Sequence, residues 1–272
     1  MRLEDSPAGR TSFRQHATLL REHLVPGSHV LEAGAGPGRF TRVLLSHGVD
    51  VTVTDISQEQ LRLNEEHVPP GSHGPGKVRG RHQMDICDLS LFPNGTFDAA
   101  LALGGPLSYV FDEADTALEE LIRVTRQGGT LIVSVMSLFG ALRVYLPGIL
   151  MQLRSPEFRD QFSSILATGD IPIVDAAHHS CRMYTAERLR ALLAAHGCTP
   201  VHMQASNMLT ASEELSTHDP HTYHRHGPRT SIDELLTPGT APLLQEYEDA
   251  ACRSAGNVDS GTHIIAVCTV PE

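Results

Sequence analysis

The sequence predicts an α/β fold in which helices cover both faces of a mostly parallel β-sheet. Apolar runs of strand length alternate with segments of helical periodicity through the first half of the chain, as is typical of parallel sheets. A glycine-rich turn, Gly34 to Gly38, follows the first predicted strand, and the acidic Asp55 ends the second. A strand, a glycine turn, a helix and a second strand that ends in an acid form the unit with which α/β proteins bind nucleosides.

The predicted elements follow this alternation up to residue 135. Apolar spacing predicts a helix over residues 13–24, which ends at Pro26-Gly27. The next elements are a strand over 29–33, a helix from about 38 to 48, a strand over 51–55, a helix that Ser57 and Gln60 begin as a capping box, and a strand over 78–84. They are followed by a strand over 97–103, a helix over 112–125, a turn at Gly128-Gly129 and a strand over 130–135.

Several candidate site residues fall where these strands end. Glu32, Asp55, Asp85 and Leu103 each stand at or just beyond the carboxyl end of a predicted strand. Parallel α/β sheets bind their ligands outside the carboxyl ends of the strands. We therefore expect these four residues to border one shared site.

Two longer segments interrupt the alternation after residue 135. Residues 138–184 contain an apolar, helix-like part over 138–153 and a part interrupted by Pro and Gly over 155–179. The remaining predicted elements are a helix over 185–196, a strand over 200–205, an irregular segment over 207–255 and a strand over 263–270. We expect a single domain over residues 1–272, with 138–184 as a lid over the ligand site. The apolar part is equally compatible with a helix packed on the sheet or with a homodimer face.

The composition restricts the classes of partner. The net charge is −11, Lys77 is the only lysine, and the arginines are spread along the chain. A surface that binds nucleic acid concentrates basic residues, so we expect small, neutral or cationic ligands instead. The five cysteines form no C-x-x-C pair, which predicts a reduced, cytoplasmic protein. Because no secretory signal and no apolar run of membrane-spanning length is evident, we expect no membrane partner.

The glycine spacing separates two kinds of nucleoside site. Gly34, Gly36 and Gly38 read G-x-G-x-G, and Arg39 stands where a dinucleotide-binding turn has its third glycine. This argues against a nicotinamide-dependent oxidoreductase. With Glu32 before the turn and Asp55 after it, the sequence resembles the class I S-adenosylmethionine-dependent methyltransferases from about residue 13 to residue 270. The resemblance implies a Rossmann-like three-layer sandwich with seven strands, the last of them antiparallel.

The resemblance also implies a role for each residue of the cofactor site. The implied S-adenosylmethionine-binding residues are Glu32, Ala33, Gly34, Gly36, Gly38, Asp55, Ile56, Asp85, Ile86, Leu103 and Gly104. Glu32 would reach the methionine ammonium through water, Asp55 the ribose hydroxyls, and Asp85 the adenine amino group. The glycines would let the backbone approach the ligand. The alternative is that these are ordinary turn residues of an unrelated α/β domain.

Ile56 and Ile86 would pack on the adenine, and Leu103 and Gly104 would border the sulfonium. The acceptor-facing segment of the family follows the fourth strand, and here it reads Gly104 to Tyr109. It lacks the Asp/Asn-Pro-Pro-Tyr/Phe signature of enzymes that methylate exocyclic amines of nucleic acid bases.

Fewer residues are candidates for catalysis than for cofactor binding. Tyr109 could orient the acceptor, and His178 or His179 could take a proton from a hydroxyl or an ammonium. Packing for the tyrosine and a surface or structural role for the histidines are the alternatives. A second group, His218, His221, His224 and His226, has no cysteine nearby and contains two Pro steps, so a solvated loop is favoured over a metal site. We expect no metal.

These observations predict an enzyme that transfers the methyl group of S-adenosylmethionine to an O or N atom of a small organic acceptor. Besides the nicotinamide-dependent oxidoreductase that Arg39 disfavours, two alternatives stay open. One is an RNA or protein methyltransferase, which the negative charge disfavours. The other is a protein that binds S-adenosylmethionine without catalysing a reaction.

Overall fold

A seven-stranded sheet with the order β3-β2-β1-β4-β5-β9-β8 forms the centre of the protein. The computed structural model describes residues 7–171, 180–210 and 237–271. The strands are β1 (His29–Ala33), β2 (Asp50–Asp55), β3 (Val78–Gln83), β4 (Phe97–Ala102), β5 (Thr125–Met136), β8 (Pro200–Ser206) and β9 (His263–Thr269). Strands β1 to β5 pair in parallel, and β9 lies antiparallel between β5 and β8. The predicted sheet, including its antiparallel last strand, is confirmed.

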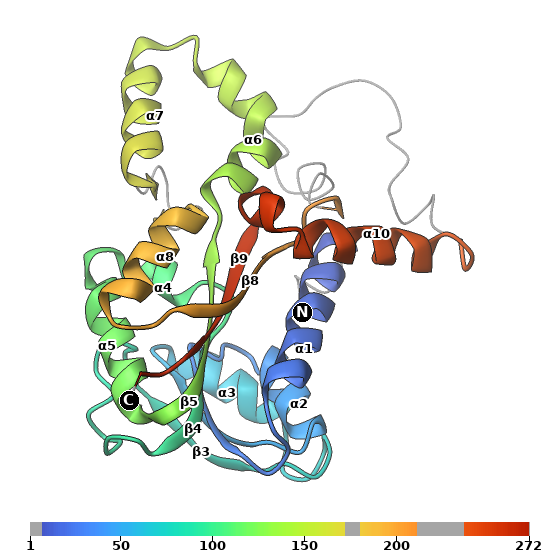
Figure 1. The fold of residues 1–272 in the computed structure, drawn as a ribbon, viewed down its shortest axis with the longest axis vertical. Helices are drawn as coiled ribbons and strands as arrows, with labels where there is room; N and C mark the ends of the chain where they lie inside the picture. The colour runs from blue at the N-terminus through green and yellow to red at the C-terminus, as the bar shows by residue number, and fades with distance from the viewer. Residues whose placement is uncertain (1–6, 172–179, 211–236, 272) are drawn as a thin grey trace.

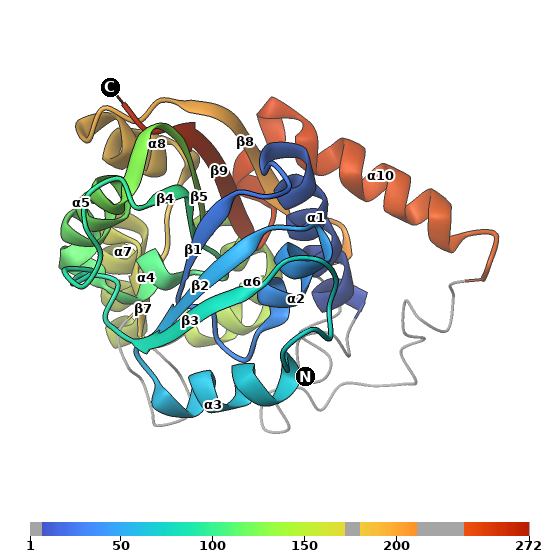
Figure 2. The same ribbon diagram turned by 90° about the horizontal axis from the view of Figure 1, so that it is seen from below.

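Helices cover both faces of the sheet, so the fold has three layers. Figure 2 shows α1 (Pro7–His23) and α2 (Arg39–Ser46) on one side, and α5 (Ala114–Val124) and α8 (Ala186–Ala195) on the other. Because side chains alternate along a strand, Val30 joins the core beneath α1 and α2, whereas its neighbour Leu31 joins the core beneath α5 and α8. Near-continuous apolar strands, buried on both faces, are what a parallel sheet requires.

The strand order reverses between β1 and β4. The chain moves outward from β1 to β2 and β3, returns to β4 beside β1, and then continues to β5. Open α/β sheets bind ligands in the crevice at this switch point. The predicted glycine turn after β1 and the predicted acceptor segment after β4 therefore lie next to each other at one edge of the sheet.

Helices α6 (Leu138–Gln152) and α7 (Pro156–Thr168) extend beyond that edge from the end of β5 (Figure 1). Helix α6 confirms the predicted apolar helix. Helix α7 corrects the expectation of an irregular segment over 155–179. Ser155 caps it by accepting a hydrogen bond from Phe158 N at 3.4 Å, and Pro156 occupies the first helical position, where a proline removes no needed hydrogen bond. The proline that suggested a break thus begins a helix.

The expectation of an irregular segment over 207–255 was also wrong in part. Residues 241–253 form α10 (Ala241–Arg253), and Pro242 lies in its first turn, where a proline removes no needed hydrogen bond. The fully buried Glu248 accepts hydrogen bonds from the backbone N–H groups of Met208, Leu209 and Thr210. A buried carboxylate therefore holds α10 against the end of β8.

Other differences concern the boundaries of predicted elements. Strand β5 begins at Thr125 rather than residue 130, because Thr125 pairs with Phe97 before the register of the two strands shifts between Phe97 and Ala99. The predicted helix over 112–125 begins as a 3-10 turn, η1 (Phe111–Glu113), and becomes α5 at Ala114. None of the described helices combines the length and apolar character needed to cross a membrane.

Candidate active site

The glycine turn adopts left-handed backbone at all three glycines. The φ angles of Gly34, Gly36 and Gly38 are 69°, 54° and 89°, values that favour glycine over residues with a Cβ. A Cβ on Gly34 would lie 2.7 Å from Pro106 Cγ, and one on Gly38 would lie 2.6 Å from Val68 Cγ2. A Cβ on Gly36 would meet nothing closer than 3.8 Å. The turn is therefore packed on both sides and open at Gly36.

Asp55 lies beside this open position with its carboxylate fixed. Its Oδ2 accepts a hydrogen bond from Gly36 N at 2.8 Å, and its Oδ1 accepts one from Ser57 N at 2.9 Å. Each carboxylate oxygen has a second lone pair, so two backbone donors orient Asp55 without exhausting its capacity. The next residue, Ile56, is 65% exposed. An oriented acceptor and an exposed apolar side chain thus lie together at the end of β2.

Glu32 lies beneath the turn and is 2% exposed. Its Oε2 accepts a hydrogen bond from Thr41 Oγ1 at 2.6 Å, whereas its Oε1 has no partner among the described residues. Burial raises the pKa of Glu32 to about 8; the Thr41 hydrogen bond opposes this shift and the Asp55 charge adds to it. A buried polar atom without a partner costs about 1–3 kcal/mol, so the structure leaves one carboxyl oxygen beside the turn that a bound ligand could satisfy.

A chain of hydrogen bonds supports Glu32 from the side of β3. Asn64 of α3 (Gln58–His67) donates to Thr41 Oγ1 at 3.0 Å, and Arg81 Nε donates to Asn64 Oδ1 at 3.0 Å. The sequence analysis missed Thr41, Asn64 and Arg81. A signal exists for Asn64, a polar residue one turn beyond Leu61 on the inward face of its helix.

The ends of β3 and β4 complete the edge. Asp85 is exposed and accepts a hydrogen bond from Cys87 N at 2.9 Å, whereas Ile86 packs into the core. Leu103 is buried, and Gly104 N donates to Ser134 Oγ at 2.7 Å. This bond ties the end of β4 to β5.

Tyr109 ends the short helix α4 (Pro106–Tyr109) close to Gly105. Its side chain is 45% exposed. Burial of the rest of the ring raises the pKa of its hydroxyl above the ordinary value. Tyr109 therefore offers a neutral hydroxyl at the acceptor side of the site.

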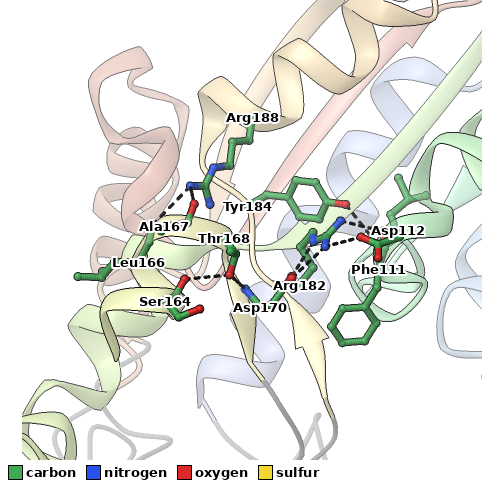
Figure 3. Close-up of polar contacts among 11 residues, drawn as sticks. Phe111, Asp112, Ser164, Leu166, Ala167, Thr168, Asp170, Arg182, Tyr184 and Arg188 are labelled. Carbon is green, nitrogen blue, oxygen red and sulfur yellow. Dashed lines mark hydrogen bonds and ion pairs between the residues drawn. The ribbon is translucent and has the colours of Figure 1, made fainter. Parts of the chain in front are cut away.

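Arg182 fastens the base of the predicted lid to the segment after β4. It belongs to β7 (Cys181–Arg182), which pairs with β6 (Asp170–Ile171) after α7. Figure 3 shows its guanidinium between two segments: it donates to Asp170 Oδ1 at 2.6 Å, to Asp112 Oδ1 at 2.8 Å and to Phe111 O at 3.1 Å. Tyr184 O–H donates to Leu107 O at 3.4 Å nearby. Asp170, Arg182 and Tyr184 are thus held against residues 107–112.

Two groups of predicted histidines lie outside the described residues. They are His178 and His179, and the cluster of His218, His221, His224 and His226. Across the described part of the chain, no group of three or more His, Cys, Asp or Glu side chains gathers as metal ligands. The roles proposed for these histidines stay predictions.

Comparison with known sequences identifies a methyltransferase domain in the chain. Residues 30–129 match a family described as a methyltransferase domain. The chain is 27% identical to malonyl-[acyl-carrier protein] O-methyltransferase of Erwinia pyrifoliae over 75% of this chain and 78% of that one. It is 34% identical to demethylmenaquinone methyltransferase of Thermobifida fusca over 47% of this chain and 52% of that one. The chain spans about half the length of most of the curated relatives it matches.

Solved structures share the fold. A methyltransferase from Methanosarcina mazei superimposes with a TM-score of 0.60 at 15% identity, covering 93% of this chain and 97% of that one. The 1,6-didemethyltoxoflavin N1-methyltransferase of Burkholderia thailandensis gives 0.54 at 17% identity, covering 96% and 79%. Residues 30–129 therefore match a methyltransferase domain, and the fold is the one found in solved S-adenosylmethionine-dependent methyltransferases.

Proposed function

We propose that this protein transfers the methyl group of S-adenosylmethionine to an O or N atom of a small organic acceptor. The observation that carries the proposal is the pair of carboxylates at the glycine turn. Asp55 is oriented by two backbone N–H groups, and Glu32 keeps one buried oxygen without a partner among the described residues. When bound, the cofactor supplies a methyl group activated by a positively charged sulfur.

The residues present suit this cofactor. The remaining lone pairs of Asp55 match two neighbouring ribose hydroxyls, and Ile56 offers an apolar surface to a base. Glu32 Oε1 would accept from the methionine ammonium, directly or through water. The first turn of α2 offers N–H groups to a carboxylate. Asp85 and Ile86 are proposed at the adenine, and Leu103 and Gly104 next to the sulfonium.

Catalysis by such a site depends mainly on positioning, because the leaving group is already activated. The chain's own task is to orient the acceptor, exclude water and accept a proton where the acceptor carries one. We propose residues 138–184 as the lid, Tyr109 as an orienting residue, and His178 or His179 as the proton acceptor. Relatives named as O- and N-methyltransferases support the choice of atoms.

We also propose a small-molecule acceptor, no nucleic acid partner and a cytoplasmic location. The net charge of −11 and the single lysine support the first two. All five cysteines are unpaired and four of them are buried, which agrees with a reducing compartment. A homodimer through α6 is a further proposal, because Phe139, Leu146 and Leu150 on this helix are exposed.

Calorimetric titration of the ligand-free protein with S-adenosylmethionine, S-adenosylhomocysteine and NADH tests the proposal. We expect both sulfur compounds to bind and NADH not to bind. Asp55→Asn should weaken S-adenosylhomocysteine binding by about 10–100-fold through loss of charge-assisted hydrogen bonds. Asp50→Asn, at the other end of β2, is the matched control and should leave the affinity unchanged.

The outcomes separate the alternatives. Absence of binding by either sulfur compound to a folded sample would refute the cofactor assignment. Equal affinities of the two Asp variants would show that the ribose contact is misassigned. If the cofactor binds but a panel of small hydroxyl and amine compounds gives no transfer, RNA, protein and non-catalytic alternatives move ahead.

A further inference from the structure

The side chain of Gln60, in α3, faces the one open position of the glycine turn. Its Oε1 is the atom nearest to the place that a Cβ on Gly36 would occupy, at 3.8 Å. Asn64 Nδ2, from the same helix, donates to Gly36 O at 3.4 Å. Residues four positions apart lie on one face of a helix, so both side chains approach the turn from α3. Of the two, Gln60 is one turn nearer to the end of β2, where Asp55 lies.

The side-chain amide of Gln60 is available because the predicted capping box forms only in part. In a complete box, the Gln side chain reaches back to the backbone N–H of the capping serine. Ser57 Oγ does accept a hydrogen bond from Gln60 N at 3.3 Å. Ser57 N, however, donates to Asp55 Oδ1 at 2.9 Å. The partly exposed Gln60 side chain therefore makes no hydrogen bond within the described part of the chain.

The two hydroxyl groups of a ribose need donors as well as acceptors. A carboxylate only accepts, so Asp55 can take the hydrogens of two neighbouring hydroxyl groups but donates nothing to their oxygens. Gly36 N, the backbone donor beside this carboxylate, already donates to Asp55 Oδ2 at 2.8 Å. The amide of Gln60 carries two hydrogens and borders the same glycine. It is thus suited to the lone pairs that Asp55 leaves unmatched.

We propose that the side-chain amide of Gln60 donates a hydrogen bond to a ribose hydroxyl oxygen of the cofactor, and that Gln60 thereby selects ribose over deoxyribose. This inference rests on the proposed function. Asp55 accepts from the hydroxyl groups and Gln60 donates to one of them, so the two side chains together match hydrogens and lone pairs. A cofactor analogue that lacks the contacted hydroxyl loses both bonds, and a site built to bind a hydroxyl rejects such an analogue strongly.

Calorimetric titration with S-adenosylhomocysteine and with its 2′-deoxy and 3′-deoxy analogues tests the contact. Gln60→Leu removes the amide, and loss of one neutral hydrogen bond should weaken S-adenosylhomocysteine binding by about 3–10-fold. The analogue that lacks the contacted hydroxyl should bind Gln60→Leu and the unmodified protein equally well. Gln60→Glu keeps the shape and the acceptor oxygens but has no donor when ionised. It should weaken S-adenosylhomocysteine binding at least as much as Gln60→Leu.

The matched control is Gln58→Leu, the same substitution at an exposed position in the first turn of α3. It should leave all three affinities unchanged. Gln60→Leu removes no hydrogen bond within the described part of the chain, so its melting temperature should not fall below that of the unmodified protein.

The outcomes separate this proposal from the one beneath it. Absence of S-adenosylhomocysteine binding by the unmodified protein would refute the proposed function itself. Normal binding that Gln60→Leu leaves unchanged, or an equal loss for all three ligands, would overturn only the Gln60 contact. Binding by Gln60→Glu as tight as that of the unmodified protein would overturn the role of the amide as a donor.

Discussion

Replacement of Glu32 by Gln should remove part of the pH dependence of the protein's stability. Glu32 is almost fully buried, and its pKa rises from the usual 4.5 to about 8. Below pH 4.5 the side chain is protonated in both the folded and the unfolded chain. Above it, the unfolded chain loses this proton while the folded protein keeps it up to about pH 8. The unfolded state therefore binds fewer protons, and the free energy of unfolding falls as pH rises through this window.

The size of the effect follows from the two pKa values. A difference between 4.5 and about 8 corresponds to about 5 kcal/mol. Local relaxation and water entry reduce this, so we expect about 3–5 kcal/mol. Gln keeps the shape and an oxygen for the Thr41 hydrogen bond but has no ionisable proton. The stability of Glu32→Gln relative to the unmodified protein should therefore rise by that amount between pH 5 and pH 8.5.

Urea unfolding of the cofactor-free protein at several pH values measures this difference. Glu120→Gln is the control, because hydrogen bonds from Arg123 hold the pKa of Glu120 below its usual value. The stabilising effect of Glu120 is lost only as pH falls through its folded pKa. The difference between Glu120→Gln and the unmodified protein should therefore stay constant from pH 5 to pH 8.5. Parallel pH profiles for the unmodified protein and Glu32→Gln would refute the reasoning.

Two further predictions concern the lid base and the glycine turn. Arg182→Gln removes ion pairs to two segments and should lower the free energy of unfolding by about 1–2 kcal/mol. The affinity for S-adenosylhomocysteine, measured by calorimetry, should stay the same. Arg62→Gln, which removes an exposed ion pair, is the control and should leave the melting temperature unchanged. Gly34→Ala should cost about 2–4 kcal/mol, because a left-handed φ and a clash with Pro106 combine. Gly71→Ala, with a similar φ but open space, should cost only about 1 kcal/mol; equal losses for the two glycines would contradict the clash.

The sequence predicted the parts of the fold whose signals are local. Alternation of apolar strands and helices identified the parallel sheet, and the spacing of Gly34 to Gly38 with Asp55 identified the edge where they meet. Helices α7 and α10 were missed because Pro156 and Pro242 resemble breaks, although each stands in a first helical turn. The distinction depends on Ser155 accepting from Phe158 N and on Glu248 being buried against residues 208–210. Neither contact produces a periodic pattern of residues in the sequence.

The contact between His16 and His263, whose ring centroids lie 6.2 Å apart, was missed for a different reason. His16 shows up in the sequence only as one polar residue in an otherwise amphipathic helix, and His263 only as the first residue of a strand. Their proximity depends on β9 inserting between β5 and β8, which brings the last strand of the chain beneath the first helix. Contacts of this kind follow from the topology of the sheet and leave no local pattern in the sequence.

The glycine turn shows that a motif can serve packing and binding at different positions. Gly34 and Gly38 face Pro106 and Val68 at distances that no Cβ could occupy, so these two glycines are required even without a ligand. Of the three glycines, only Gly36 has room for a Cβ, and its N–H orients Asp55. A side chain there would strain the backbone and fill the space beside the carboxylate without disturbing a neighbour. Of the three glycines, therefore, Gly36 is the one whose replacement should impair cofactor binding more than it impairs folding.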